Sequence, residues 1–95
     1  MIRIDDFQID EFNEAEMAAH RVSPDEVFQA LGDETRSIRR NGGDGAAQQP
    51  YLLIGRTHGG RSLTIPIRAV DERLGLWRPA TAFDTDPKYL PKQRS

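Results

Sequence analysis

Four side chains that can bind an anion or transfer a proton lie close together in the middle of the chain. They are Tyr51, Arg56, His58 and Arg61. The planar guanidinium group of arginine binds two phosphate oxygens at once. Histidine titrates near neutral pH, and a tyrosine ring can stack on a base or donate a proton. Together these groups are suited to a phosphate-bearing ligand and to acid–base chemistry.

A β-hairpin over residues 51–68 is expected to position these side chains. Two strand-like runs flank the link Thr57–Gly60, in which glycine relieves the turn. Apolar and more polar residues alternate between positions 62 and 68, which predicts one buried and one solvated face. Pro66 cannot donate a ladder hydrogen bond, so we expect its strand to lie at an edge or to carry a bulge.

A first helix is predicted before the hairpin, ending at about His20. Its N-cap is either Asp10 or Asn13, and Asn13 has the spacing of a capping box with Glu16. The apolar face of this helix is expected to hold Phe12, Ala15 and Ala19.

A second helix has clearer end signals. Residues 23–26 read Ser-Pro-Asp-Glu, which combines a capping box with a proline at the first helical position. Val27 and Leu31 lie one turn apart and are predicted to face the core, and Gly32 is expected to end the helix.

Further strands are predicted on both sides of the hairpin. Residues 35–40 form one of them, followed by a glycine-rich loop over residues 41–50. Residues 73–83 form another, where Trp77 is the largest side chain available to the core and Pro79 indicates an edge or a break.

These elements predict one α+β domain over residues 1–95, with two N-terminal helices followed by an antiparallel four-stranded meander. A short strand is also possible over residues 1–4. Residues 85–95 contain two prolines and are expected to form a loose tail, with one helical turn at residues 87–90.

Composition excludes several classes of protein and site. The chain has no cysteine and two histidines of different setting, so we expect no metal site, no disulfide and no cofactor. No run is long and apolar enough to cross a membrane, and the N-terminus lacks the apolar core of a signal peptide. A cytoplasmic protein without a membrane partner is expected.

Charge is distributed unevenly along the chain. Residues 1–34 hold ten acidic and two basic residues, whereas residues 35–95 hold eleven basic and five acidic residues. The net charge is only −2. The basic part is suited to a polyanion or to an acidic partner, but attraction between the two parts within the fold explains the split equally well.

Four short motifs, in this order, resemble the BrnT family. They are Phe12-Asn13-Glu14-Ala15, His20-Arg21-Val22-Ser23, Tyr51-Leu52-Leu53-Ile54-Gly55-Arg56 and Arg61-Ser62-Leu63, and the resemblance covers about residues 9–83. BrnT proteins are toxins of bacterial type II toxin–antitoxin pairs. The resemblance implies a RelE-like fold, ribonuclease activity and neutralisation by a ribbon-helix-helix antitoxin of the BrnA kind.

Under this resemblance the hairpin becomes a site of mRNA cleavage without a metal ion. His58 and Tyr51 are then candidates for proton transfer, and Arg56 and Arg61 for stabilising charge on the phosphate. Further arginines are candidate RNA contacts, namely Arg36, Arg39, Arg40, Arg68 and Arg78. A homodimer and a hetero-oligomer with the antitoxin both remain open.

A second hypothesis is a non-catalytic module of the same fold that uses its basic sheet for a protein or nucleic-acid partner. The acidic pI near 5.6 favours this hypothesis. A second argument for it is that residues 85–95 stand where the family usually has a basic helix. Each candidate residue also has a structural interpretation. His58 is then a solvated turn residue, His20 part of the helix junction, the arginines a solvent face, and Tyr51 part of the packing.

Overall fold

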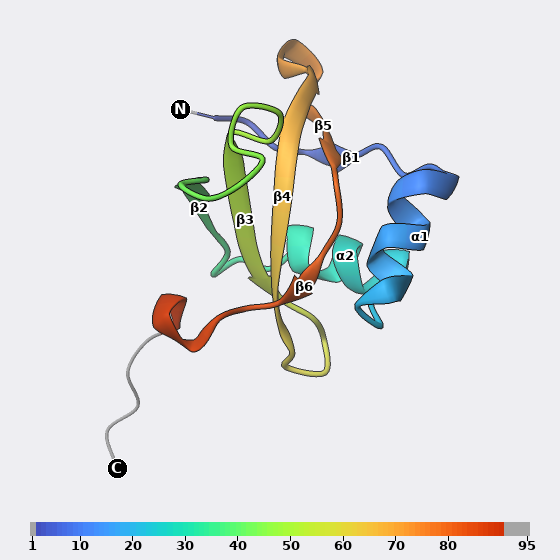
Figure 1. The fold of residues 1–95 in the computed structure, drawn as a ribbon, viewed down its shortest axis with the longest axis vertical. Helices are drawn as coiled ribbons and strands as arrows, with labels where there is room; N and C mark the ends of the chain where they lie inside the picture. The colour runs from blue at the N-terminus through green and yellow to red at the C-terminus, as the bar shows by residue number, and fades with distance from the viewer. Residues whose placement is uncertain (1, 91–95) are drawn as a thin grey trace.

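The structure is a computed structural model that describes residues 2–90. It is α+β, with two helices and a mixed six-stranded sheet (Figure 1). The helices are α1 (Glu11–Ala19) and α2 (Pro24–Leu31), with 3-10 turns η1 (Glu72–Leu74) and η2 (Pro87–Tyr89). The strands are β1 (Asp6–Phe7), β2 (Ser37–Arg40), β3 (Tyr51–Arg56), β4 (Ser62–Asp71), β5 (Leu76–Pro79) and β6 (Phe83–Asp84).

The sheet contains the predicted meander and two additional short strands. The order β1-β5-β4-β3-β2 includes four consecutive strands, β2 to β5, that pair antiparallel. The prediction of only four strands is wrong, because β1 joins β5 in parallel and β6 pairs with β4. The N-terminal strand lies at Asp6–Phe7, and residues 2–4 of the strand predicted over residues 1–4 are not in a strand. Residues 73–83 do not form one strand, since η1 precedes β5 and Pro79 ends it.

Pro66 lies in β4, a central strand, so a place at an edge, the first of the two predicted alternatives, is wrong, whereas a bulge, the second alternative, is present in β4. Its carbonyl accepts a hydrogen bond from the N–H of Ala80, just beyond the end of β5. The N–H and C=O of a residue in an antiparallel strand point to the same neighbouring strand. Pro66 has no N–H, but it faces the segment between β5 and β6, where the chain has left the hydrogen-bonded ladder. The irregularity of β4 lies further on, between Ala69 and Asp71.

Helix α2 packs directly against β3 and has the predicted ends. Ser23 caps its N-terminus in a capping box with Glu26, and Gly32 follows its last turn. A Cβ atom on Gly55 would collide with the backbone carbonyl of Ala30. Glycine at this position of β3 therefore allows the helix and the sheet to approach closely.

Helix α1 is rotated relative to the prediction. Asp10 is its N-cap and Asn13 completes the box. The Asn13 side chain is buried, and its amide donates to the carbonyls of Gln8 and Pro79 at 2.9 and 3.0 Å. This face of α1 turns inward with Met17, so the predicted apolar face is wrong. Phe12 is 71% exposed.

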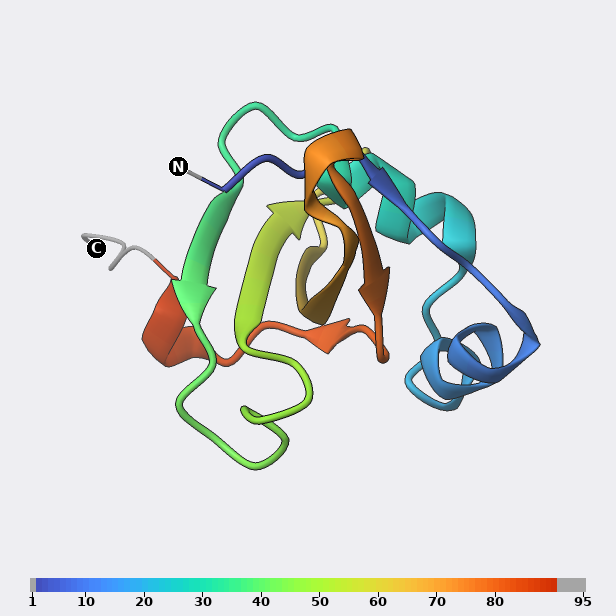
Figure 2. The same ribbon diagram turned by 90° about the horizontal axis from the view of Figure 1, so that it is seen from above.

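The core lies between α2 and one face of the sheet. Leu53, Ile65, Ile67 and Trp77 are almost completely buried there. We call the opposite face, which carries Leu52, Ile54, Thr64 and Pro66, the helix-free face. Figure 2 shows α2 on one side of the sheet, with the loop after β2 and the segment of β6 and η2 on the other.

The segment after β6 is held against the helix-free face as far as Leu90. Thr85 is buried, and its hydroxyl meets the hydroxyls of Ser62 and Thr64 at 2.9 and 3.0 Å. The predicted helical turn at residues 87–90 is present as η2. Residues 85–90 are therefore packed against the sheet, and the rest of the expected tail, residues 91–95, lies outside the described part of the chain.

Candidate functional site

The link between β3 and β4 is a tight turn fixed to α2. The N–H of Thr57 donates to the carbonyl of Arg61, and Gly60 adopts a φ of 87° that favours glycine. At the tip, the backbone N–H of His58 donates to the side-chain oxygen of Gln29 at 2.9 Å. The His58 side chain is exposed and lies over α2, where it lines a shallow cavity with Asp25 and Phe28.

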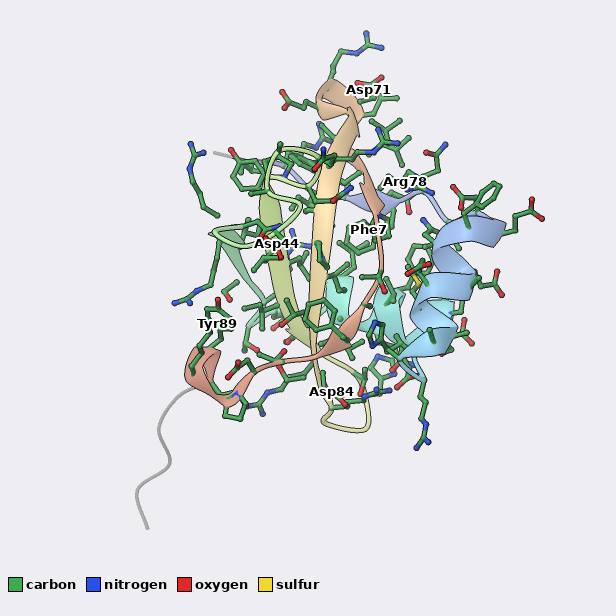
Figure 3. The ribbon with its side chains drawn as sticks, in the orientation of Figure 1. Phe7, Asp44, Asp71, Arg78, Asp84 and Tyr89 are labelled. Carbon is green, nitrogen blue, oxygen red and sulfur yellow. The ribbon has the colours of Figure 1, made fainter. Side chains whose placement is uncertain are left out.

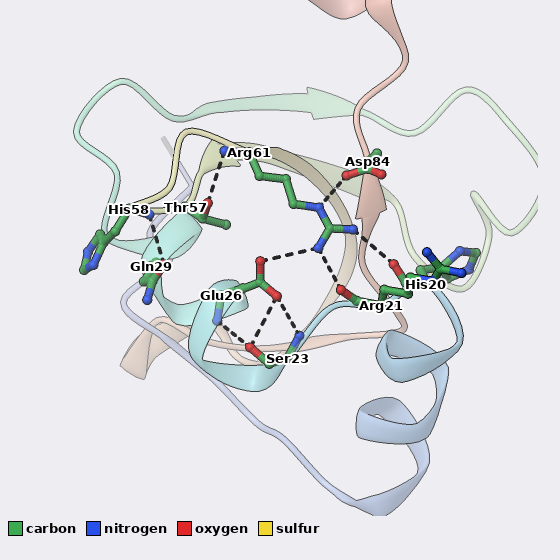
Figure 4. A network of polar contacts seen from close by, with 9 residues as sticks. All are labelled: His20, Arg21, Ser23, Glu26, Gln29, Thr57, His58, Arg61 and Asp84. Carbon is green, nitrogen blue, oxygen red and sulfur yellow. Dashed lines mark hydrogen bonds and ion pairs between the residues drawn. The ribbon is translucent and has the colours of Figure 1, made fainter.

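Arg61 is the centre of a polar network that joins β4, β6 and the turn between the helices (Figure 4). Its Nε donates to Asp84 at 2.5 Å, and one Nη donates to Glu26 at 3.4 Å. The two Nη atoms also donate to the carbonyls of Arg21 and His20, at 2.7 and 3.1 Å. Every nitrogen of the Arg61 guanidinium therefore donates a hydrogen bond within the protein, which gives this side chain a structural role.

The pKa shifts of Asp84 and Arg61 are consistent with their ion pair. The hydrogen bond from Arg61 holds the pKa of the Asp84 carboxyl below its usual value, and the charge of His20 adds to the effect. The same contact with Asp84 raises the pKa of Arg61. The ring of His20 packs on Phe83 with 5.7 Å between centroids. His20 thus lies beside the network and next to a residue of β6.

Tyr51 is far from the hairpin turn. It begins β3 and pairs with Ile67, whereas Arg56 ends the strand and pairs with Ser62. At about 3.3 Å per residue, roughly 16 Å separate the two ends of this strand. The Tyr51 ring packs edge-on against Trp77 with centroids 5.8 Å apart. The structure therefore does not bring together the four residues predicted as catalytic.

Two of the arginines predicted to contact RNA have structural partners instead. Arg36 donates to the carbonyls of Leu31 and Ile4, at 2.7 and 3.0 Å. Arg78 forms an ion pair with Asp10 at 2.8 Å (labelled Arg78 in Figure 3). The N–H of Asn13 and the Arg78 side chain both lower the pKa of Asp10. The bonds Arg61–Glu26 and Arg78–Asp10 also join the acidic and basic parts of the sequence, so part of the charge split is internal.

The remaining arginines predicted to contact RNA form no ion pair within residues 2–90, and neither does Arg56. They are Arg39, Arg40 and Arg68. Arg40 shares the core-side face with Tyr51 and lies over its ring, 5.8 Å from the centroid. Arg39 pairs in register with Leu52, and Arg56 and Arg68 lie two residues beyond Ile54 and Pro66. Because strand residues alternate between faces, these three arginines belong to the helix-free face.

Two neighbouring cavities lie on this face. The first, about 450 Å³, is bounded by the loop after β2, the sheet and residues 80–89, and we call it the Thr81 cavity. The second, also about 450 Å³, is lined by Asp33, Arg56 and Tyr89, and we call it the Arg56 cavity. Tyr89 lines both cavities, and Arg39 lies over its ring at 5.0 Å. In Figure 3, Tyr89 and Asp44 mark this side of the molecule.

Asp33 lines the Arg56 cavity as a structural acceptor. It accepts hydrogen bonds from the backbone N–H groups of Thr35 and Arg56, at 2.9 and 2.8 Å, and these lower its pKa. The carboxylate thereby fixes the end of β3 and leaves the Arg56 guanidinium exposed beside the cavity.

Sequence reasoning missed Asp84 and Tyr89. Asp84 lies 23 residues after Arg61 and belongs to no local pattern, so nothing in the sequence indicates the pairing. Tyr89 had a signal, since residues 87–90 were predicted to form a helical turn, but the turn alone does not indicate that it packs on the sheet. Glu26 was recognised only as a capping residue.

Residues 2–90 contain no group of three or more histidine or acidic side chains placed to hold a metal ion. Neither helix of the described chain is long and apolar enough to cross a bilayer. Comparison of the sequence and the structure with models of protein families, with curated proteins and with solved structures finds no match.

Proposed function

We propose that this chain is a BrnT-like toxin of a type II toxin–antitoxin pair. In this proposal it is a metal-independent ribonuclease that binds single-stranded mRNA on its helix-free face, and a BrnA-like ribbon-helix-helix antitoxin neutralises it. The four motifs given above support the family. The arginines of the helix-free face carry the functional part of the proposal.

The observation that carries it is the group of exposed cations next to two cavities. Arg39, Arg56 and Arg68 have no ion-pair partner among the described residues, so their charges are available to phosphates. Tyr89 lies between the two cavities, and Arg39 and Lys88 each lie 5.0 Å from the centre of its ring. Basic side chains that alternate with an aromatic ring are typical of surfaces that bind single-stranded nucleic acid.

Proton transfer in the proposed reaction is better assigned to His20 than to His58. His58 lies over α2, on the side away from the helix-free face. His20 packs on Phe83, which lines the Thr81 cavity. In this proposal a histidine packed on Phe83 lies near RNA bound along the face, and an imidazole can both donate and accept a proton.

The test compares two double variants with the same change in charge. Arg39→Ala/Arg68→Ala removes two cations of the helix-free face, whereas Arg40→Ala/Arg73→Ala removes one from the core-side face and one from η1. Using a labelled single-stranded RNA, we expect the first variant to lose at least tenfold in affinity and in cleavage rate, and the second to resemble the wild type. Equal effects of the two variants would refute binding on this face.

A non-catalytic binding module is the second candidate. The engagement of every Arg61 nitrogen favours it, because a catalytic phosphate contact requires a free guanidinium. His20→Ala separates the two functions. A ribonuclease loses cleavage and the ability to arrest growth while still binding RNA. A binding module binds RNA without cleaving it, and the variant changes nothing.

A further inference from the structure

The Thr81 cavity has an apolar floor and aromatic walls suited to a flat ring. Leu52 and Pro66 of the sheet form its floor, and Phe83 and Tyr89 line its sides. Its volume of about 450 Å³ lies within the range of small-molecule sites, roughly 300–1,000 Å³. One aromatic heterocycle with part of an attached sugar fits this space.

The polar groups that line the cavity determine which hydrogen-bonding groups a bound ring must carry. The hydroxyl oxygen of Thr81 is shielded from solvent and has no hydrogen-bond partner within residues 2–90. A buried polar atom without a partner is costly, and rotation of the Thr81 side chain toward a ligand in the cavity would satisfy it. Two carboxylates, Asp44 and Asp86, also line the cavity. One oxygen of Asp86 accepts from the N–H of Lys88 at 3.0 Å, and its second oxygen makes no hydrogen bond to another described residue.

The carboxylates make the cavity unsuited to a phosphate and suited to a hydrogen-bond donor. Two cations are close to these carboxylates, because Lys88 also lines the cavity and both Lys88 and Arg39 lie 5.0 Å from the centre of the Tyr89 ring. A nucleotide would therefore place its base inside and its phosphates outside, near these cations. Asn41 does not compete as a ligand group, since its amide holds the loop through Gln49 and Gly43.

We infer that the Thr81 cavity binds one nucleobase of single-stranded RNA and prefers a base with an exocyclic amino group. Adenine, cytosine and guanine have such a group, which offers two N–H donors to a carboxylate, whereas uracil has a single N3–H between two carbonyl oxygens that a carboxylate repels. This inference rests on the proposed RNA-binding function and adds a base preference to it. The phosphates next to the bound base would lie toward Arg39 and Arg68.

Nucleosides test the inference without any requirement for cleavage. We would titrate the full chain with cytidine, adenosine and uridine and follow backbone amide resonances by NMR. Cytidine and adenosine should shift the amides of Thr81, Phe83 and Asp86, with affinity at least tenfold above that of uridine. Equal responses to cytidine and uridine, shifts confined to other parts of the molecule, or no binding at all would each overturn the inference.

Two variants and a control identify the groups responsible. Asp86→Asn keeps the cap of η2, because asparagine also caps a turn, and should reduce the preference for cytidine over uridine to less than threefold. Thr81→Val keeps the shape of the side chain without the hydroxyl and should weaken all nucleosides. Asp25→Asn makes the same change of charge on α2 and should have no effect. Unchanged Trp77 fluorescence would show that each variant folds.

The outcomes separate this inference from the proposed function. If the protein binds nucleosides selectively but neither binds nor cleaves RNA, the cavity is a nucleobase site and the proposed ribonuclease function is refuted. RNA cleavage without any preference for an amino-bearing base in the nucleoside titrations would retain the ribonuclease and refute the cavity as a base site.

Discussion

Replacement of Arg61 is expected to destabilise the fold. The guanidinium makes four contacts, to two carboxylates and two backbone carbonyls. Asp84 is 71% exposed, so its ion pair contributes only about 0–1 kcal/mol. Arg61 itself is 28% exposed, and the charge-assisted bonds to the carbonyls of His20 and Arg21 contribute more. We expect Arg61→Ala to lower the free energy of unfolding by about 2–4 kcal/mol.

Arg61→Lys gives a second, graded value. Lysine keeps the charge but cannot satisfy acceptors that lie in several directions at once. Its cost should therefore be about half that of alanine, roughly 1–2 kcal/mol.

Urea unfolding followed by Trp77 fluorescence measures these changes. Trp77 is the single tryptophan and is 2% exposed, so its emission reports on the core. Arg56→Ala is the matched control, because Arg56 is exposed and forms no ion pair within residues 2–90, and it should change stability by less than about 0.5 kcal/mol. If Arg61→Ala were as stable as this control while RNA cleavage was lost, Arg61 would be a phosphate ligand and the structural interpretation would be wrong.

Three further predictions concern stability. The pKa of Asp84 in the folded state lies below the usual value of 3.8, so the Asp84 carboxylate contributes to stability above pH 3.8 and this stability is lost as the pH falls through the folded-state pKa. Urea midpoints measured from pH 6 to pH 2 should therefore decrease less in Asp84→Asn than in the wild type. Gly55→Ala should cost about 1–3 kcal/mol in urea unfolding, since its Cβ would meet the carbonyl of Ala30, whereas Gly32→Ala, which has room for a Cβ, should be nearly neutral. Asn13→Ala should cost about 2–4 kcal/mol by leaving the buried carbonyl of Pro79 without its donor, and a thermal unfolding midpoint close to that of the wild type would contradict this.

Elements with local end signals were predictable from the sequence. The capping pattern at Ser23 needs only neighbouring residues, and so does the hairpin turn before Gly60. Helix α1 shows where local reasoning fails. Its rotation is decided by Asn13, which reaches the carbonyl of Pro79 at the end of β5. Helical periodicity treats asparagine as a solvent residue, so it places Phe12 inside.

The candidate site was less predictable than the fold. The sequence indicated a basic hairpin, but it did not show which arginines have internal partners. Arg61 and Arg56 look alike in the sequence and differ in the structure, because only Arg61 reaches Asp84 and the helix junction. Such pairings depend on strands that meet after folding. The cavities also need tertiary structure, because each is lined by segments that are far apart in the chain.

The parallel pairing of β1 with β5 has a consequence for the order in which the molecule assembles. It joins residues 70 positions apart, Asp6 with Leu76 and Phe7 with Trp77, and within residues 2–90 β1 has no other strand partner. The meander can form from neighbouring strands, whereas β1 can add only to a β5 already in place, and distant contacts close slowly. The indole N–H of Trp77 also donates to the carbonyl of Arg3 at 2.7 Å. We therefore expect the single tryptophan to reach its final surroundings late in folding, when the N-terminal strand adds to the sheet.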